Sequence, residues 1–249
     1  MAAVAASRQI RQSWRHTGSR ANRRSAVNTG FHGYFSCDLH RSVRIKDGRG
    51  IDQACGTGGM LSTGYNFIKR YNPSADVRLF GQEINPESYA MCLAEMLIKG
   101  QNAENICYQD TMKADRFKGT KMRFVLENPP FGTAWGGKDA AEGVEDAVNT
   151  EYLKGFDGRW GAGLPSSGDM QMLFLQSAID KMDDNFGRAA IIENGSPLFA
   201  GGTASGESQI RRWMLEQDLR SVSKGGSAPF GTRLCGAKCS VLYALSALP

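Results

Sequence analysis

The sequence predicts an α/β domain in which helices cover both faces of a parallel β-sheet. From about residue 50 onward, short apolar runs alternate with segments whose apolar residues recur at helical spacing. This alternation is typical of parallel sheets, because the chain must return to the start of the next strand through a crossover helix. Ligands of such sheets bind beyond the carboxyl ends of the strands, and the polar motifs of this chain follow its apolar runs.

Five strands are expected, each an apolar run that ends in a polar turn. They are residues 44–50, which are weakly patterned, and then residues 77–82, 105–108, 122–126 and 189–192. Between the second and third strands, helical spacing relates Tyr89, Leu93, Met96 and Leu97. Before the fifth strand it relates Met170, Leu173, Phe174, Ser177 and Ala178. We interpret both stripes as core packing. The glycine-rich residues 132–168 show no clear period and are expected to form a long loop.

Charge divides the chain into three parts. Residues 1–50 contain ten Lys or Arg against two acidic residues, a net charge of +8, and residues 219–249 carry +4 without an acid. Residues 51–218 carry a net charge of −7. We expect residues 1–49 to be a basic segment, disordered or foreign to the fold, because it lacks apolar periodicity. Residues 50–218 are the expected folded core, and residues 219–249 its degraded carboxyl-terminal end.

Composition excludes a membrane protein of the helical kind. The chain is 41% hydrophobic, but no apolar run approaches the roughly 20 residues of a membrane span. The first residues lack the apolar region of a secretory signal, although their Arg/Ser content superficially resembles an organelle transit peptide. The cysteines show no spacing typical of disulfides or of a zinc site: Cys37, Cys55, Cys92, Cys107, Cys235 and Cys239. We interpret them as reduced thiols of a cytoplasmic protein without a metal site.

A glycine-rich motif follows the first expected strand. It comprises Asp52, Gln53, Ala54, Cys55, Gly56, Thr57, Gly58 and Gly59. Glycines between a strand and a helix let the backbone approach a ligand closely, and the helix N-terminus offers free N–H groups to an anion. In S-adenosylmethionine that anion is the methionine carboxylate. The motif alone does not distinguish this cofactor, because many nucleotide binders share such loops and some glycine pairs form simple turns.

Acidic residues follow the next two expected strands. Glu83 lies about two dozen residues beyond the glycine-rich motif, which is the position of an acid that accepts ribose hydroxyls in nucleoside-binding folds. Asn85, followed by Pro86, is typical of a helix N-cap, so Asn85 can cap the helix while Glu83 binds the ribose. Asp110 is placed to accept the adenine amine of the cofactor, although a solvated turn acid is an equal interpretation.

The motif Asn128-Pro129-Pro130-Phe131 follows the fourth expected strand. The lone pair of adenine N6 is delocalised into the ring, so N6 is a poor nucleophile unless its hydrogens are accepted. The Asn128 side-chain oxygen and the Pro129 carbonyl could accept them, and the adjacent prolines restrict the backbone. Phe131 offers a face on which an extruded base can stack, worth about 1–3 kcal/mol. The tetrapeptide alone could also be a simple turn, and the ordered set of motifs is what favours an amine site.

This ordered set resembles the N6-adenine DNA methyltransferases, in particular the modification subunit of type I restriction–modification systems. The resemblance covers about residues 50–218. It rests on the motifs that begin at Asp52, Gly81, Glu127 and Gly187, and on the segments that begin at Leu198 and Ile210. It implies a Rossmann-like methyltransferase sheet, S-adenosyl-L-methionine as cofactor and methyl transfer to N6 of adenine in DNA. It also implies partnership with a specificity subunit and with a restriction subunit, which would supply DNA affinity that the acidic middle lacks.

The chain also departs from this family. Gln53 stands where the family usually has proline, and residues 1–50 do not resemble the family's helical N-terminal domain. Residues 220–226 interrupt the apolar strands that complete the sheet, so we expect the sheet to be incomplete at its carboxyl-terminal strands. We hypothesise that both basic ends are frame-shifted translations that flank a genuine core. The alternatives are an inactive, truncated or frame-shifted relic, or a related methyltransferase that acts on RNA or on a protein glutamine.

Overall fold

The computed structural model describes residues 47–184, 187–194, 196–217, 221–224 and 240–245. The expectations for residues 1–46 and 225–239 lie outside these described residues. The elements, in chain order, are β1 (Asp47–Asp52), α3 (Gly59–Tyr71), β2 (Asp76–Glu83), α4 (Pro86–Ile98), η1 (Ala103–Asn105), β3 (Ile106–Tyr108), β4 (Phe124–Glu127), α5 (Val144–Tyr152), η2 (Gly155–Asp157), α6 (Gln171–Lys181), β5 (Arg188–Glu193), α7 (Ser196–Phe199), α8 (Gly206–Glu216), β6 (Ser221–Lys224) and β7 (Ser240–Leu245).

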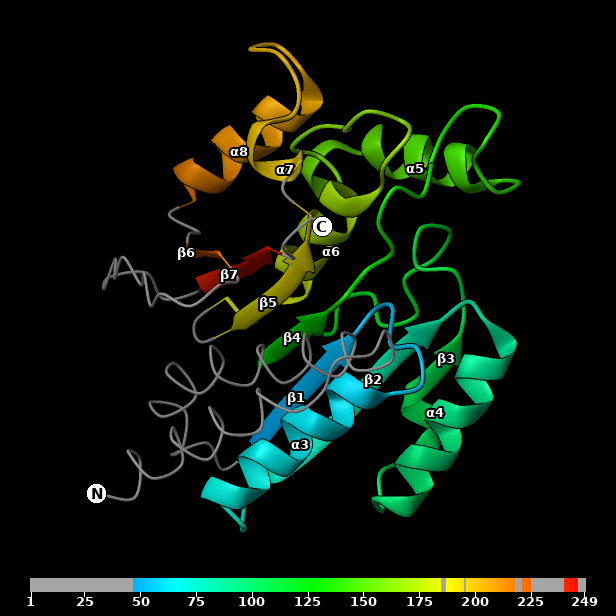
Figure 1. Cartoon of the computed structure of the whole chain (residues 1–249), viewed down its shortest axis with the longest axis vertical. Coiled ribbons are helices and arrows are strands. Elements are labelled where there is room, and N and C mark those ends of the chain that lie inside the picture. Colours follow the sequence, from blue (N-terminus) through cyan, green and yellow to red (C-terminus); the bar gives the residue numbers. More distant parts are fainter. Residues whose placement is uncertain (1–46, 185–186, 195, 218–220, 225–239, 246–249) are drawn as a thin grey trace, which may run out of the picture.

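The strands form one sheet in the order β3-β2-β1-β4-β5-β7-β6, and every pairing is parallel (Figure 1). The chain builds outward from β1 to β3 and then returns to place β4 on the other side of β1. The strand order therefore reverses between β1 and β4, and a crevice for ligands opens at this point in folds of this type. The expected α/β architecture with a parallel sheet is confirmed.

The sheet is buried on both faces, as parallel sheets usually are. On one face α3 and α4 cover Val77, Leu79 and Phe124, and on the other α6 covers Val125 and Ile191. Successive residues of a strand point to opposite faces, which is why Phe124 and Val125 belong to different clusters. The apolar runs of β4 and β5 are continuous for this reason, whereas β2 alternates exposed and buried residues in its first half.

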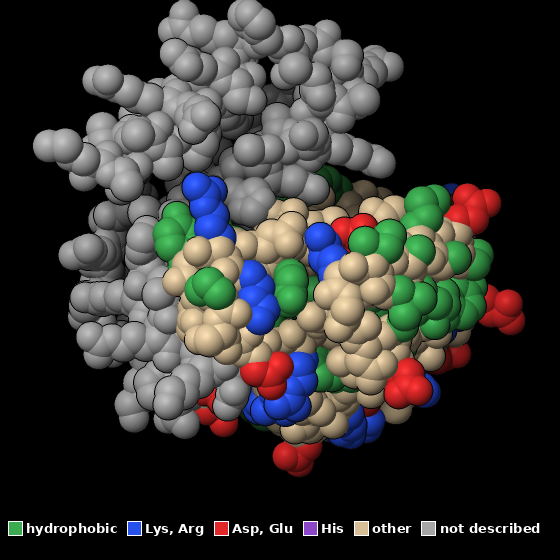
Figure 2. Space-filling model, turned by 90° about the horizontal axis from the view of Figure 1, so that it is seen from below, with side chains coloured by type: hydrophobic (Ala, Val, Ile, Leu, Met, Phe, Trp, Pro, Cys, Tyr) green, Lys and Arg blue, Asp and Glu red, His purple; other side chains and the backbone are tan. Residues whose placement is uncertain are grey.

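Helix α4 begins where the sequence indicates. The Asn85 side chain accepts a hydrogen bond from the backbone N–H of Ser88 at 2.9 Å, and Pro86 occupies the first turn. Of the four residues expected to share a buried face, Met96 is fully buried, whereas Leu97 is 67% exposed. The buried partner of Met96 is instead Cys92. Apolar side chains gather on the right of Figure 2, at the end of the molecule where α4 lies.

Two segments differ from the sequence-based expectation. Residues 132–168 contain helix α5 and the short helix η2 and are not a continuous loop. Helix α5 has only two buried apolar residues, Val144 and Val148, which lie one turn apart. Two residues are too few to produce a period that can be recognised between glycine-rich flanks.

The second difference lies at the carboxyl-terminal edge of the sheet. An interruption was expected after Leu219, but β6 lies at Ser221–Lys224 and pairs in parallel with β7, which in turn pairs with β5. The sheet therefore has seven strands among the described residues. No helix of the described ranges is long and apolar enough to cross a membrane.

A buried ion pair links the two halves of the sheet. The ammonium of Lys181, at the end of α6, is 1% exposed and contacts the carboxylate of Asp115, which follows β3 along the chain. The same ammonium donates to the carbonyl of Phe117 at 2.8 Å. Because both charges are removed from water, each depends on the other for compensation.

We predict that Lys181→Met lowers the free energy of unfolding by about 3–5 kcal/mol, because Asp115 is left as an uncompensated buried charge. Urea unfolding followed by circular dichroism measures the loss. Adding Asp115→Asn to Lys181→Met should recover much of it, because the orphaned charge is then removed. As a matched control, Arg212→Met removes a cation from the exposed pair with Glu216 and should change stability little. Equal losses in the two single variants would contradict the prediction.

Candidate functional site

The carboxyl ends of four strands bring the predicted site residues to one edge of the sheet. Strand β1 ends at Asp52, β2 ends at Glu83, Asp110 follows β3, and Asn128 follows β4. The parallel register pairs Asp52 with Gly81, Glu83 with Tyr108, and Ile51 with Val125. The motifs that the sequence places after successive strands therefore meet in space.

The glycine-rich loop makes a tight turn into α3. Gly56 and Gly58 have positive φ angles of 54° and 80°, a conformation that favours glycine. A Cβ atom at Gly58 would also lie 2.9 Å from the Cys92 sulfur. Helix α3 begins without a side-chain cap and without an acid in its first turn. Its first N–H groups therefore remain suited to an anionic ligand.

The side chain of Cys55 faces the interior and not the crevice. It is 5% exposed, and its sulfur lies 3.8 Å from that of Cys92 on α4. Both are free thiols, as is Cys107, in agreement with the expectation of reduced cysteines at these positions. Ala54 and Gly59 are half-buried, and Thr57 is exposed at the tip of the loop.

Glu83 joins the glycine-rich loop to the next strand. Its carboxylate accepts hydrogen bonds from the backbone N–H of Gly56 and from that of Asn85, each at 2.7 Å. A carboxylate oxygen can accept more than one hydrogen bond, so Glu83 can hold the loop and still accept ribose hydroxyls. The Asn85 side chain caps α4, so the structure assigns it the N-cap position that the sequence indicates.

Asp110 is held by a clamp that the sequence does not reveal. Its Oδ1 accepts from the backbone N–H of Met112 at 2.8 Å. The guanidinium of Arg159 donates to the carbonyls of Thr111 and Met112, and it lies 4.1 Å from the centre of the Trp160 ring. Burial lowers the pKa of Arg159. Arg159 was missed because it lies in the glycine-rich stretch that lacks a period.

The turn at residues 128–131 is largely exposed to solvent at the carboxyl end of β4. Asn128 and Phe131 are exposed, the latter by 42%, whereas Pro129 is buried and anchors the turn. The following backbone is held by a second segment: Trp135 N–H donates to Ser167 at 2.9 Å, and Met170 N–H donates to Thr133 at 3.0 Å. These contacts brace the loop on the carboxyl-terminal side of the exposed pair.

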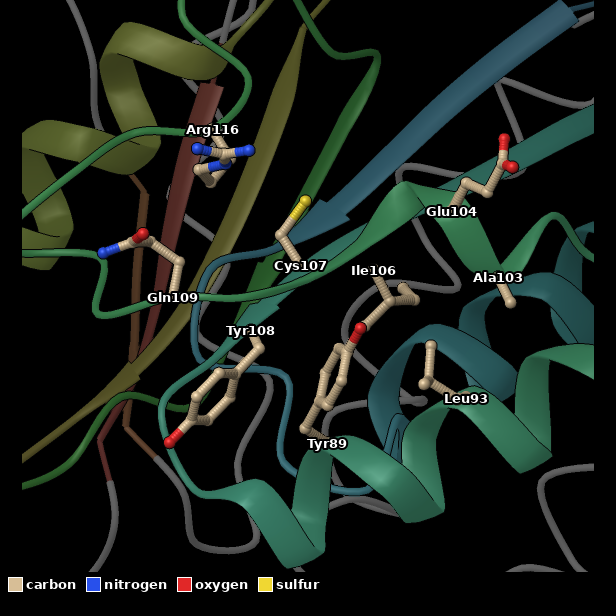
Figure 3. Close-up of a pocket in the computed structure, with 9 residues that line it drawn as sticks. All are labelled: Tyr89, Leu93, Ala103, Glu104, Ile106, Cys107, Tyr108, Gln109 and Arg116. Carbon is tan, nitrogen blue, oxygen red and sulfur yellow. The ribbon is translucent and has the colours of Figure 1, made fainter.

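A surface pocket of about 550 Å³ lies beside this edge, between α4 and β3. Figure 3 shows Tyr89 and Leu93 of α4 facing the strand, with Tyr108 next to Tyr89. The two tyrosine ring centres are 5.6 Å apart. Gln109 lines the pocket and precedes Asp110, so the pocket borders the strand-end site without including its predicted residues.

Three buried acids stand directly behind the site. Asp52 is 2% exposed, and burial together with the charge of Glu83 raises its pKa to about 7, despite a hydrogen bond from the Ala54 N–H. Burial also raises the pKa values of Glu127 and Glu193, which end β4 and β5, well above their ordinary range. Glu127 and Glu193 were not predicted. Each could have been recognised in the sequence as an acidic residue that comes directly after the apolar residues of a strand.

The described residues contain no group of three or more His, Cys, Asp or Glu side chains arranged to hold a metal ion. What the edge offers is an uncapped helix N-terminus, a carboxylate beside the loop, a clamped aspartate and an exposed amide with an aromatic ring.

Comparison with known proteins identifies a family model and several relatives with similar sequences. A family model described as N-6 DNA Methylase matches residues 39–222. The chain is 27% identical over 175 residues to the type I restriction enzyme HindI methylase subunit of Haemophilus influenzae, which covers 69% of this chain and 36% of that protein. It is 24% identical over 181 residues to the type I restriction enzyme MjaIX methylase subunit of Methanocaldococcus jannaschii, with 70% and 29% covered. The chain spans about a third of the length of these curated relatives.

Solved structures share the fold. The type I restriction-modification system methyltransferase subunit from Streptococcus thermophilus superposes with a TM-score of 0.60 at 24% identity, over 78% of this chain and 39% of that one. A Listeria monocytogenes protein described as a class I S-adenosylmethionine-dependent methyltransferase gives a TM-score of 0.58 at 14% identity, over 83% and 56%. The expected Rossmann-like methyltransferase fold is confirmed.

The pKa of Asp52 leads to a prediction about stability. Between about pH 4 and pH 7 the folded chain keeps a proton on Asp52 that the unfolded chain has lost, so this group makes the fold less stable as pH rises. Asp52→Asn removes the titration and keeps an oxygen for the Ala54 N–H. We therefore expect the free energy of unfolding of Asp52→Asn to exceed that of the wild type by an amount that increases with pH. The increase should be about 1.4 kcal/mol per pH unit through this window and should then level off.

Urea unfolding at half-unit steps from pH 4.5 to pH 8 measures this difference. Asp139→Asn changes an exposed aspartate in the same way and should show no such growth. A constant difference between Asp52→Asn and the wild type at every pH would contradict the assignment.

Proposed function

The chain belongs to the N-6 DNA methylase family, and from this premise we propose that it binds S-adenosylmethionine and transfers the methyl group to N6 of adenine in DNA. The observation that carries the proposal is the meeting of four features at one sheet edge. These are the uncapped N-terminus of α3, Glu83, Asp110 and the exposed pair Asn128 and Phe131.

The residues at this edge fit the cofactor. The free N–H groups of the first turn of α3 suit the methionine carboxylate, and Glu83 has acceptor capacity left for ribose hydroxyls. Asp110 Oδ1 is engaged by the Met112 N–H, which leaves its second carboxylate oxygen for an exocyclic amine. S-adenosylmethionine, when bound, supplies an electrophilic methyl group on a sulfonium.

The chain's own contribution to the reaction is to hold and polarise the target amine. Adenine must leave the DNA stack to reach Asn128, and Phe131 offers a surface for the extruded ring. The side-chain oxygen of Asn128 and the carbonyl of Pro129 accept the two N6 hydrogens, which returns electron density to the nitrogen. Fixing the nucleophile in line with the methyl group contributes about 7–11 kcal/mol of the catalysis through positioning.

We further propose that the chain acts as the modification subunit of a type I restriction–modification system, together with a specificity subunit and a restriction subunit. The relatives named as type I restriction enzyme methylase subunits support this proposal. So does the net charge of −7 over residues 51–218, because tight DNA binding normally needs a basic surface. Sequence recognition and most DNA affinity would then lie in the partner.

Two measurements test the proposal in sequence. Isothermal titration with S-adenosylmethionine reports whether the chain binds the cofactor, and absence of binding by folded protein would favour an inactive relic. Transfer of a radiolabelled methyl group to duplex DNA, with and without a specificity subunit, then reports activity. Labelling of RNA or of a protein glutamine in place of DNA would redirect the proposal to those substrates.

We predict that Asn128→Ala reduces methyl transfer by about a hundredfold to a thousandfold while leaving the affinity for S-adenosylmethionine within about twofold of the wild type. The reason is that Asn128 is assigned to the target amine, and removal of one preorganised hydrogen-bonding group at a reacting centre typically costs about 10²–10³ in rate. Asn66→Ala, a matched change at an exposed residue of α3, should leave both quantities unchanged. Retention of transfer by Asn128→Ala would remove Asn128 from this role.

A further inference from the structure

A set of unpartnered polar atoms lies at the ends of β1, β4 and β5. Both side-chain atoms of the Gln53 amide and both carboxyl oxygens of Glu127 and of Glu193 are buried without a hydrogen-bond partner. The three residues are at most 1% exposed. Buried polar groups almost always have partners, so six such atoms at neighbouring strand ends are unusual and make this cluster a candidate for interaction with a bound ligand.

The charges around these atoms are of one sign. Asp52 and Glu193 act on Glu127, Asp169 acts on Glu193, and Glu83 acts on Asp52. The backbone N–H of Gln53 lies close enough to the Glu127 carboxyl to lower its pKa, but it does not meet the geometry of a hydrogen bond to either oxygen. Proline, which the resemblance leads one to expect at position 53, would lack this N–H. No ion pair among the described residues includes Asp52, Glu127 or Glu193.

Among the residues that the structure describes, no cation pairs with this group, and the group's place in the fold indicates which ligand cation could do so. Glu127 directly precedes Asn128, and Asp52 opens the glycine-rich loop, so the acids stand behind both halves of the proposed site. Strands β1 and β4 are also the pair between which the strand order reverses. S-adenosylmethionine brings a positive sulfonium to such a site, whereas its product S-adenosylhomocysteine is neutral at sulfur.

We propose that Asp52, Glu127 and Glu193 form a charge-sensing group, in which binding of a sulfonium cofactor is coupled to loss of a proton from Glu127. This inference rests on the proposed function and deepens it. The O–H bond of the Glu127 carboxyl breaks, the proton passes to the solvent buffer, and the resulting buried carboxylate would attract the positive charge of the sulfonium through space. When the methyl group has left, the sulfur is neutral, the proton returns, and the product is held less tightly.

The state of the acids before binding agrees with this scheme. Burial raises the pKa values of Glu127 and Glu193 well above their ordinary range, and the charges of Asp52 and then Glu193 add to the effect on Glu127. A fully buried carboxyl with no cation beside it favours its protonated, neutral form. A nearby positive charge favours the ionised form of a carboxyl. Binding of the cationic cofactor is therefore expected to lower the affinity of Glu127 for its proton.

The experiment is isothermal titration of the full chain at pH 7.5 in phosphate and in Tris, whose ionisation enthalpies differ. The difference in heat between the buffers gives the number of protons released for each ligand. We expect S-adenosylmethionine to release more protons than S-adenosylhomocysteine and to bind about tenfold more tightly, which corresponds to a coupling of one pKa unit. Sinefungin, which carries an amine in place of the sulfonium methyl, should behave like the cationic cofactor.

Glu127→Gln keeps the size and neutrality of the protonated acid but cannot release a proton. In this variant the excess proton release should vanish, and the tenfold preference for the cationic cofactor should be lost. Glu193→Gln should reduce the excess proton release and the preference for the cationic cofactor without abolishing either. The control Glu142→Gln makes the same change at an exposed site and should leave both at the wild-type values. Thermal melting of each variant shows that it is folded, and Glu193→Gln decides the question if Glu127→Gln does not fold.

The outcomes separate the two proposals. A folded wild-type chain that binds neither ligand would overturn the proposed function, and the inference with it. A chain that binds both ligands with equal proton release and equal affinity would overturn the inference alone. Binding with excess proton release that persists in both glutamine variants would assign the proton to another group and would equally contradict the proposal.

Discussion

Parallel pairing of β1 with both β2 and β4 is the constraint on which the rest of the structure depends. A parallel sheet covered by helices on both faces is largely apolar in its central strands, so the polar residues of the proposed site lie where the strands end. All carboxyl ends of parallel strands lie at the same edge, and the strand order reverses between β1 and β4. The glycine-rich loop, Glu83, Asp110 and Asn128 are brought together by this topology and need no other device.

Crowding acids at that edge has an energetic cost. Asp52, Glu127 and Glu193 are each at most 2% exposed, and a buried carboxyl without a partner avoids the cost of an unpaired charge by keeping its proton. Glu83 differs because it has two backbone N–H groups as partners. Glu83 is therefore satisfied by the protein itself, and Asp52 accepts one hydrogen bond from the Ala54 N–H, whereas the carboxyl oxygens of Glu127 and Glu193 have no hydrogen-bond partner. This contrast distinguishes the acid that holds the loop from the two acids that are coupled to cofactor binding in the proposed scheme.

The sequence predicts the sheet and the order of the site motifs well, because both are local signals. Apolar runs identify strands β2 to β5, and the glycine pair, Glu83, Asp110 and Asn128 can be read as motifs after successive strands. Long-range contacts are what the sequence conceals. Arg159 clamps the Asp110 loop from more than 40 residues away, and α5 has two buried residues where a period needs more. Leu97 was expected to be buried but is exposed, because helical spacing alone cannot distinguish the buried face of α4 from the adjacent exposed face.

The distribution of charge links the site to the rest of the proposed system. The described core is acidic, and its most buried acids lie behind the point at which a cation and an extruded base would meet. The net charge of −7 over residues 51–218 opposes the DNA backbone, since phosphates are repelled by a negative field. The buried acids add to this field only when they lose their protons, which in the proposed scheme happens when a sulfonium is bound. In the proposed partnership with a specificity subunit, the positive surface that DNA needs would lie on another chain, away from these acids.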